Sequence, residues 1–374
     1  MTNIEKILSD LIAIRTDALG RSNKECVDYI CRILSENGIL FRRVAHAGGQ
    51  CESVIAGVNV QELKNIKTGL VLSGHMDTVG VNPKDWDTNP FVATSLNGRI
   101  YGRGTVDMKY FIAVVLSVLS ELKEVGYPIF LLFSADEETE VEGIRVLTSF
   151  LQMRNICPKY ALVGEPTNFE VCVSSKGYCG YTTVVKGVSA HSSRPDLGVN
   201  AIYAVAQIVS EIEKYNMQYM ASDTTLNVGI ISGGVQRNSI PSEASFDWEI
   251  RFSEEKHKNE ISNKIQQLQS KLSQTYGHLY VRTEVRENLP AFERIEKSKA
   301  VEIAQSILNT DVLTLPVATE AGFLQKIGID TIVCGAGDVK LAHTSSENIK
   351  VTDLERYKEF LLKYVKAIES DMSK

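Results

Sequence analysis

Apolar residues recur at helical spacing near the start of the chain. Between residues 2 and 38 they fall every three or four positions, as Ile4, Ile7, Leu8, Leu11 and Ile12 and then as Val27, Ile30 and Leu34. This period predicts helices over the segment, the last of which ends before Gly38.

Short, continuous apolar runs follow, and they predict buried strands. They cover residues 69–75, 128–134 and 160–164, with one more at 331–334, while residues 108–123 form an apolar segment of helical length. Strands that alternate with helices predict an α/β sheet with helices on both of its faces.

The pattern changes over residues 177–288. It predicts a strand, a helix, two strands, a polar helix and a last strand, at 178–186, 200–214, 224–231, 244–252, 254–276 and 279–285. The order β-α-β-β-α-β is that of a ferredoxin-like unit, which can fold as a module inserted in a loop. We therefore expect one α/β domain built from residues 1–176 and 289–374, interrupted by an α+β insertion.

Composition excludes several classes of function. The 374 residues carry a net charge of −6 and no stripe of Lys and Arg, so we expect no nucleic-acid partner. The longest apolar stretch, residues 111–122, is too short to span a bilayer, and the N-terminus lacks the apolar core of a signal peptide. The seven cysteines are scattered without a CxxC motif, which is typical of free thiols in a reducing cytoplasm.

Potential metal ligands follow the predicted strands. His75 ends the first strand, Glu137 and Glu138 come just after the second, and Glu165 comes just after the third. In an open α/β sheet, ligands bind beyond the carboxyl ends of the strands. We therefore expect these side chains to lie in one cleft.

Several acids in one cleft repel each other unless cations are present. A pair of divalent metal ions removes this conflict, and mixed histidine and carboxylate ligands suit zinc, with cobalt or manganese as alternatives. Such a pair turns a bound water into a nucleophile near neutral pH. Each of these residues alone has an ordinary structural explanation, but their ordered placement at strand ends favours the metal site.

Five ordered motifs carry a resemblance to a known family. They are Ser73–Val79 (SGHMDTV), Gly102–Lys109 (GRGTVDMK), 136–138 (DEE), Gly164–Thr167 (GEPT) and the late His343. Together they resemble the dizinc family of acetylornithine deacetylase, succinyl-diaminopimelate desuccinylase, aminoacylases and carboxypeptidases. The likeness spans almost the whole chain, and it implies a zinc-peptidase-like sheet interrupted by a ferredoxin-like lid that forms a homodimer.

The resemblance implies five ligands for two divalent ions, zinc or else cobalt. His75, Asp107 and Glu165 would hold one ion, while Asp107, Glu138 and His343 would hold the other. Asp107 would therefore bridge the two ions.

The same resemblance implies two further roles beside the metals. Glu137 would be the general base that deprotonates the attacking water and later protonates the leaving amine. Asp77 would orient the site without binding a metal ion itself. The peptide bond between Asp107 and Met108 would be cis. One departure from the family is Tyr110, where its members usually carry glycine.

The inserted domain also carries family-like positions. His191 resembles the histidine that reaches the active site of the neighbouring subunit and stabilises an oxyanion. Asn238 and Arg251 resemble residues that bind the substrate carboxylate, for which a guanidinium is well shaped. Without the resemblance, His191 is better explained as a turn residue capped by serine. The alternative for Arg251 is a surface residue of an edge strand, but its guanidinium favours the functional interpretation.

Two segments resemble acetylornithine deacetylases in particular, namely residues 198–202 and 318–323. Glu320, in the second, would meet a cationic side chain such as the ornithine ammonium, and its alternative is a solvated loop residue. The resemblance thus implies a cytoplasmic enzyme that removes the acetyl group from N-acetylornithine, a small N-acyl amino acid, in arginine biosynthesis.

Other functions remain open at this point. Within the family they are desuccinylation of succinyl-diaminopimelate, deacylation of another N-acyl amino acid, and dipeptide hydrolysis. In another class, a catalytically silent metal-binding homologue would keep the fold and lose a ligand or the base, but the ligand and base positions hold competent residues. A nucleotide-binding oxidoreductase is not supported, because the first strand is followed by no GxGxxG and the chain has no P-loop.

Overall fold

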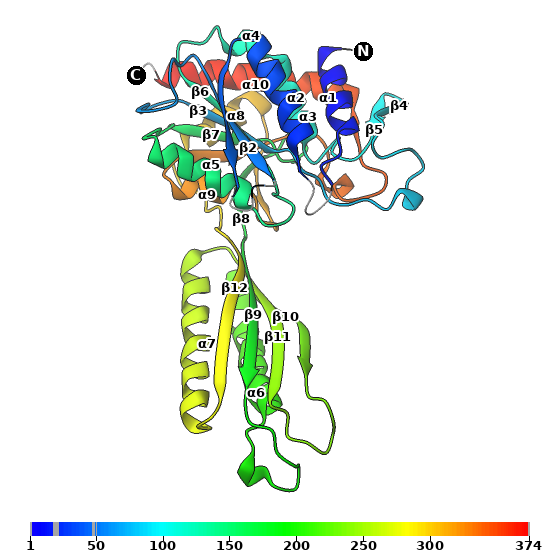
Figure 1. Ribbon diagram of the computed structural model, residues 1–374. Helices are drawn as coiled ribbons and strands as arrows, with labels where there is room; N and C mark the ends of the chain where they lie inside the picture. Colours follow the sequence, from blue (N-terminus) through cyan, green and yellow to red (C-terminus); the bar gives the residue numbers. More distant parts are fainter. Residues whose placement is uncertain (1, 18–21, 47–48, 50, 373–374) are drawn as a thin grey trace. The chain divides into compact units, whose positions relative to one another are not determined.

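The computed structural model describes residues 2–17, 22–46, 49 and 51–372 (Figure 1). The chain divides into two compact units. Unit 1 comprises Met1–Val173, Arg294–Thr314 and Phe323–Lys374, and unit 2 comprises Ser174–Glu293 and Leu315–Gly322. The mixed α/β fold class expected from the sequence is confirmed.

Unit 1 is built on an eight-stranded mixed sheet in the order β1-β2-β6-β3-β7-β14-β8-β13. The strands are β1 (Leu40–Ala45), β2 (Glu52–Val58), β3 (Leu70–His75), β6 (Ile129–Ser134), β7 (Tyr160–Val163), β8 (Val171–Ser175), β13 (Val312–Leu315) and β14 (Asp330–Val333). The central strands β6, β3, β7 and β14 run parallel to one another. Strands β3 and β6 are buried along their whole length, as their continuous apolar runs predict.

Helices lie on both faces of this sheet (Figure 1). They are α1 (Asn3–Ala13), α2 (Lys24–Glu36), α3 (Lys109–Ser117), α4 (Leu119–Leu122), α5 (Glu142–Met153), α8 (Lys299–Leu308), α9 (Ala321–Lys326) and α10 (Val351–Met372). Thr2 caps α1, since its hydroxyl accepts the N–H of Glu5 while the Glu5 carboxylate accepts the N–H of Thr2. A small sheet of β4 (Thr94–Leu96), β5 (Arg99–Tyr101) and β15 (Asn348–Lys350) completes the unit.

The apolar segment at 108–123 differs from the single helix expected there. It is divided at Val118 into α3 and α4, and the Ser117 hydroxyl donates a hydrogen bond to the carbonyl of Val114. A hydroxyl bonded to the preceding turn bends a helix. At the other end of α3, the buried Lys109 ammonium donates to the carbonyls of Leu11 and Ile14, which fastens α3 to the end of α1.

Unit 2 contains the ferredoxin-like arrangement. Its elements are β9 (Gly177–Lys186), α6 (Ala201–Tyr219), β10 (Thr225–Gly233), β11 (Glu243–Phe252), α7 (Glu255–Thr275) and β12 (Tyr280–Leu289). The four strands form an antiparallel sheet in the order β10-β11-β9-β12, and both helices pack against it around one apolar core. Trp248 stacks on Tyr181 in this core, with ring centroids 4.2 Å apart.

Two simple findings complete the description. All seven cysteines are free thiols. Among the described residues, the structure contains no helix whose length and apolar character would let it cross a membrane.

Candidate active site

The parallel strands bring the expected ligands to one edge of the unit 1 sheet. His75 is the last residue of β3, and it lies opposite Ser134, the last residue of β6. Glu137 and Glu138 therefore follow at the same edge, and Glu165 follows the end of β7. His343 comes from the segment after β14, in a left-handed backbone conformation with φ of 62°.

Asp107 lies at the centre of this group. Its Oδ1 is 2.9 Å from His75 Nε2, and its Oδ2 is 3.1 Å from His343 Nε2. His343 Nε2 is also 3.0 Å from Glu138 Oε1, and His75 Nε2 is 3.8 Å from Glu165 Oε1. The structure thus contains two three-residue groups that share Asp107, each with its ligand atoms within 4.8 Å of one another. The peptide bond between Asp107 and Met108 is cis.

The electrostatics of the cluster favour positive charge. Burial lowers the pKa of His75, but the carboxylates of Asp107 and Asp77 raise it by more, so the pKa lies well above its usual value. Hydrogen bonds that the protonated ring donates to the carboxylates of Asp107 and Glu138 raise the pKa of His343 to about 10. Burial raises the pKa of Asp107, yet His343 and His75 together hold it below its usual range. Two imidazoles and three carboxylates that attract cations in this way are a suitable donor set for a pair of divalent metal ions.

Asp77 connects the histidine to the loop that carries the two glutamates. Its carboxylate oxygens accept the backbone N–H groups of Glu137 and Glu138, at 3.1 and 3.0 Å. His75 Nδ1 lies 2.9 Å from the backbone carbonyl of Asp77 and 3.6 Å from its carboxylate. The carboxylate therefore holds the glutamate loop, while the carbonyl orients the ring so that Nε2 points to Asp107.

Glu347 was missed by the sequence reasoning. This fully buried carboxylate accepts the backbone N–H groups of Gly104, Val106 and Asp107 at 2.8 to 3.1 Å. It also pairs with the buried guanidinium of Arg103, at 2.6 Å. Glu347 thus fixes the loop that presents Asp107, and only its position four residues after His343 could have pointed to it.

Tyr110, the departure from the family pattern, has a defined role in the packing. Its buried hydroxyl donates to the carbonyl of Gly164 at 2.7 Å and accepts the N–H of Ala336 at 2.8 Å. It therefore links the segments that follow β7 and β14, directly beside Glu165.

Unit 2 carries the remaining expected residues. The His191 segment forms a backbone bridge to Ser239, and the N–H of Ser192 donates to the carbonyl of Asn238, so these two loops lie side by side. The His191 ring is exposed and lies 2.8 Å from the Ser193 hydroxyl. Arg251 lies on β11, where its Nε donates to Glu249 at 2.9 Å.

Glu320 belongs to the short stretch of unit 2 that comes from the C-terminal part of the chain. Its side chain is fully buried. This burial excludes the solvated loop residue that was the alternative explanation.

Comparison with known proteins identifies the family. An acetylornithine deacetylase of Buchnera aphidicola subsp. Acyrthosiphon pisum is 28% identical over 365 residues, which cover 95% of this chain and 93% of that protein. The solved structure of aminopeptidase PepT from Bacillus cereus covers 97% of both chains with a TM-score of 0.77 and 18% identity. The Bacillus subtilis YXEP protein, described as a dinuclear metal binding peptidase, covers 98% of this chain and 99% of its own, with a TM-score of 0.68 and 13% identity.

The family model for peptidase family M20/M25/M40 matches residues 71–367. This range includes all five residues of the shared metal cluster. The chain therefore belongs to peptidase family M20/M25/M40 and is a metallohydrolase of that family.

Proposed function

We propose that this enzyme removes the acetyl group from N-acetylornithine with the help of two zinc ions. The observation that carries the proposal is the convergence of five ligand side chains on one sheet edge, in a chain whose full-length relative is named acetylornithine deacetylase. Cobalt fits the same donors, and it serves as the alternative ion in reconstitution experiments.

His75, Asp107 and Glu165 would hold one ion, and Asp107, Glu138 and His343 the other. When bound, such a pair polarises the acyl carbonyl and lowers the pKa of a water molecule. The protein itself supplies the proton transfer. We assign this role to Glu137, whose backbone is held by Asp77 next to the ligand Glu138.

Hydrolysis requires a proton to move from the oxygen of the attacking water to the nitrogen of the leaving amine. The Glu137 carboxylate takes a proton from the attacking water, whose oxygen bonds to the acyl carbon. The bond between that carbon and the amine nitrogen then breaks, and Glu137 returns the proton to the nitrogen. This transfer gives acetic acid and the free amine, and Glu137 regains its starting charge. The acid then ionises to acetate as its proton passes to the amine, directly or through solvent, so the amino acid leaves as the ammonium form.

Unit 2 would supply recognition of the substrate. We propose that Asn238 and Arg251 bind its α-carboxylate, that His191 from a second subunit stabilises the oxyanion, and that Glu320 pairs with the side-chain ammonium. Support comes from the adjacent loops of His191 and Asn238 and from the burial of Glu320, which excludes a solvated position for its carboxylate.

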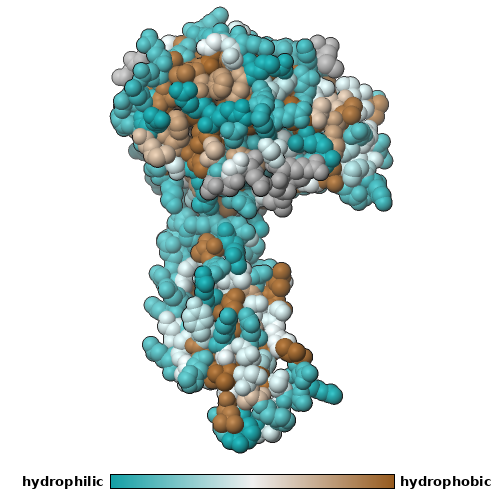
Figure 2. Space-filling view, viewed as in Figure 1, coloured by the Kyte–Doolittle hydropathy of each residue, from teal (hydrophilic) through white to brown (hydrophobic). Residues whose placement is uncertain are grey.

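A homodimer through unit 2 would bring His191 to the partner's site. Unit 2 has two sheet edges, β10 and β12, and apolar side chains lie exposed along β10 and just after it, namely Ile230, Ile231 and Val235. Figure 2 shows such apolar groups among the hydrophilic surface of this unit. Sedimentation equilibrium tests the dimer, and a monomer at assay concentrations would contradict the role proposed for His191.

The free cysteines support a cytoplasmic location.

The first experiment compares Glu137→Gln with Glu140→Gln, an exposed acid of the same loop. Both variants are depleted of metal, reloaded with zinc and assayed on N-acetylornithine. We expect Glu137→Gln to lose turnover with its metal content unchanged, and Glu140→Gln to keep both. Turnover retained by Glu137→Gln would disprove its role as the base.

A second experiment tests the substrate. The panel contains N-acetylornithine, N-acetylcitrulline, N-succinyl-diaminopimelate and dipeptides, each assayed with zinc and with cobalt. We expect the highest kcat/KM on N-acetylornithine, and a larger loss in Glu320→Gln for N-acetylornithine than for the uncharged N-acetylcitrulline. An equal loss on both would argue against charge recognition, and a preference for another panel member would replace the proposed substrate.

A further inference from the structure

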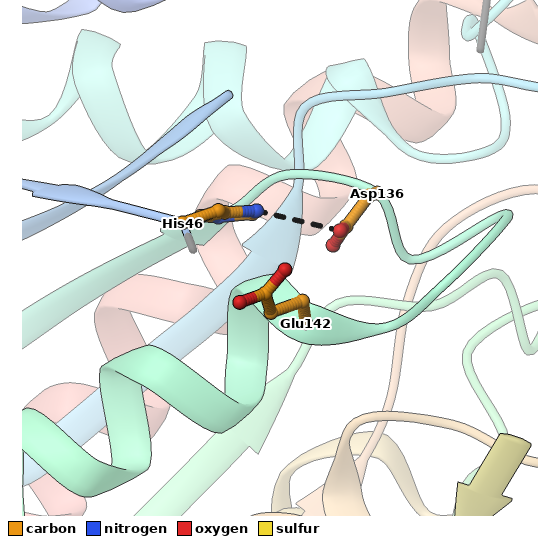
Figure 3. Close-up of side chains that lie close together, drawn as sticks. All are labelled: His46, Asp136 and Glu142. Atoms are coloured by element: carbon orange, nitrogen blue, oxygen red, sulfur yellow. Dashed lines mark ion pairs between the residues drawn. The ribbon is translucent and has the colours of Figure 1, made fainter. Parts of the chain in front are cut away.

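A second group of potential ligands lies in unit 1, outside the five residues of the catalytic proposal. His46 follows β1, Asp136 lies in the loop after β6, and Glu142 opens α5. Each offers one ligand atom, and these atoms lie within 4.8 Å of one another. Figure 3 shows the imidazole directed at the Asp136 carboxylate, with the Glu142 carboxylate turned toward both.

The histidine of this group is held in a fixed orientation. His46 is 6% exposed, and its Nε2 lies 3.0 Å from the hydroxyl oxygen of the fully buried Ser53. The same Ser53 oxygen accepts the N–H of Ala135 at 3.2 Å, which ties the imidazole to the end of β6. Histidines that bind metals commonly have their second nitrogen fixed by such a hydrogen bond. With the proton on Nε2, the Nδ1 lone pair faces Asp136.

The aspartate is held equally well. Asp136 has a left-handed backbone with φ of 60°, and its carbonyl accepts the N–H groups of Thr139 and Val141. Its Oδ1 accepts the N–H of Gly143 at 2.8 Å, so Oδ2 is the oxygen that faces His46, at 3.4 Å from Nδ1. Zinc bonds of about 2.0–2.1 Å at tetrahedral angles separate two ligand atoms by about 3.3 Å. The observed separation therefore suits two ligands of one ion.

The charges of the group also favour a cation. With a neutral imidazole, the two carboxylates give the group a net charge of −2. Nitrogen and oxygen donors in this mixture suit zinc and related divalent ions of the first transition row.

We propose that His46, Asp136 and Glu142 form a third binding site for a divalent transition-metal ion, separate from the shared cluster around Asp107. Three protein ligands leave a fourth tetrahedral position for water or a small anion. An ion there joins the end of β1, the loop after β6 and the start of α5. That loop also carries Glu137 and Glu138, so an ion there would restrain the segment that presents these two residues.

Metal counting tests this site directly. The chelator-treated enzyme is equilibrated with buffered zinc over a range that first saturates the shared cluster and then extends well above it. Bound zinc per chain is measured by native mass spectrometry. We expect three ions in the unaltered enzyme, two in His46→Gln and two in Glu142→Gln. His278→Gln, which changes an exposed histidine of unit 2, should keep three.

Anomalous scattering from crystals grown with zinc then locates each ion. A peak within bonding distance of His46 Nδ1 and Asp136 Oδ2, absent in Glu142→Gln, supports the proposal. Glu142 is only partly buried, so this variant should fold even if His46→Gln does not. Two ions per chain throughout the range, or a third peak elsewhere, would show that the three side chains form only an ion-paired structural contact and would overturn the proposal.

Discussion

Replacing Glu347 by glutamine tests whether a buried carboxylate fixes the loop of Asp107. Glutamine keeps the shape and one oxygen of the side chain. It removes the negative charge that faces Arg103. It also places an NH₂ group opposite backbone N–H groups that donate to the carboxylate in the unaltered protein. Arg103 is 4% exposed, so water cannot replace the missing partner.

The magnitude follows from that burial. Removing one partner of a buried ion pair costs about 3–5 kcal/mol, because the other charge remains uncompensated. The hydrogen bonds from backbone N–H groups to a charged acceptor contribute about 1.5–3 kcal/mol each, although these values do not add. We therefore expect Glu347→Gln to lower the free energy of unfolding of unit 1 by at least about 3 kcal/mol.

Urea unfolding followed by tryptophan fluorescence measures this loss. The chain has two tryptophans, and Trp86 lies 5.2 Å from the Arg103 guanidinium. In a Trp248→Phe background, Trp86 alone reports on unit 1. Glu355→Gln, at an exposed position of α10, is the matched control and should change stability by less than about 0.5 kcal/mol.

A double-mutant cycle separates the ion pair from the backbone contacts. In an Arg103→Met background no buried cation is left unpaired, so Glu347→Gln should cost less there than in the native chain. The reasoning is refuted if Glu347→Gln is no more destabilising than Glu355→Gln. An equal cost with and without Arg103 would refute the ion-pair part alone.

Three further predictions follow from single contacts. Asp77→Asn disturbs the acceptor of two backbone N–H groups in the loop after β6, and should lower kcat by about 10–100-fold. Gly164→Ala would place a Cβ 2.0 Å from the buried ring of Phe111, and we expect a loss of about 1–3 kcal/mol in urea unfolding. Asp371→Asn should lower Tm slightly at neutral pH, because the hydrogen bond that Lys159 donates lowers the pKa of Asp371. The Tm difference between the two proteins is present above the ordinary pKa of 3.8 and should vanish as the pH falls through the lowered pKa.

Each of these predictions has its own control. Asp87→Asn removes an exposed carboxylate and should leave kcat unchanged; an equal fall there would remove the case for Asp77. Gly80→Ala meets only the carbonyl of Asp17, at 3.6 Å, so it should be tolerated. A Tm difference at Asp371 that persists unchanged into strong acid would show that its ion pair is not the cause.

The sequence predicted the parts of unit 1 that depend on short-range patterns. Continuous apolar runs marked the buried parallel strands β3, β6 and β7, and a ligand placed after such a strand must lie at the carboxyl edge of the sheet. The flanking strands β1 and β2 were not predicted. β1 has the sequence LFRRVA, which contains adjacent arginines and is mostly accessible to solvent. Its position therefore depends on pairing with β2 rather than on its own apolar pattern.

The supporting contacts of the site could not be predicted, because they join residues far apart in the chain. The Glu347 carboxylate accepts the N–H of Val106, which lies 241 positions earlier in the chain. The Tyr110 hydroxyl accepts the N–H of Ala336, which lies 226 positions later. No local spacing encodes such pairs. Asp77 shows the same limit on a smaller scale: the sequence indicates that it orients the site, but not that its carboxylate accepts two backbone N–H groups of another loop.

The division of the chain suggests why the chemistry was easier to infer than the substrate. All five residues of the shared cluster belong to unit 1, whereas Asn238, Arg251 and Glu320 belong to unit 2. A substitution in unit 2 can change which acyl amino acid binds without altering any ligand, because specificity depends on contacts that differ between substrates. Loss of Glu137 should therefore lower kcat for every substrate of the panel, while loss of the Glu320 charge should change their ratio. If both variants changed the panel in the same way, recognition and proton transfer would not be separable, and the assignment of the two roles to two units would be wrong.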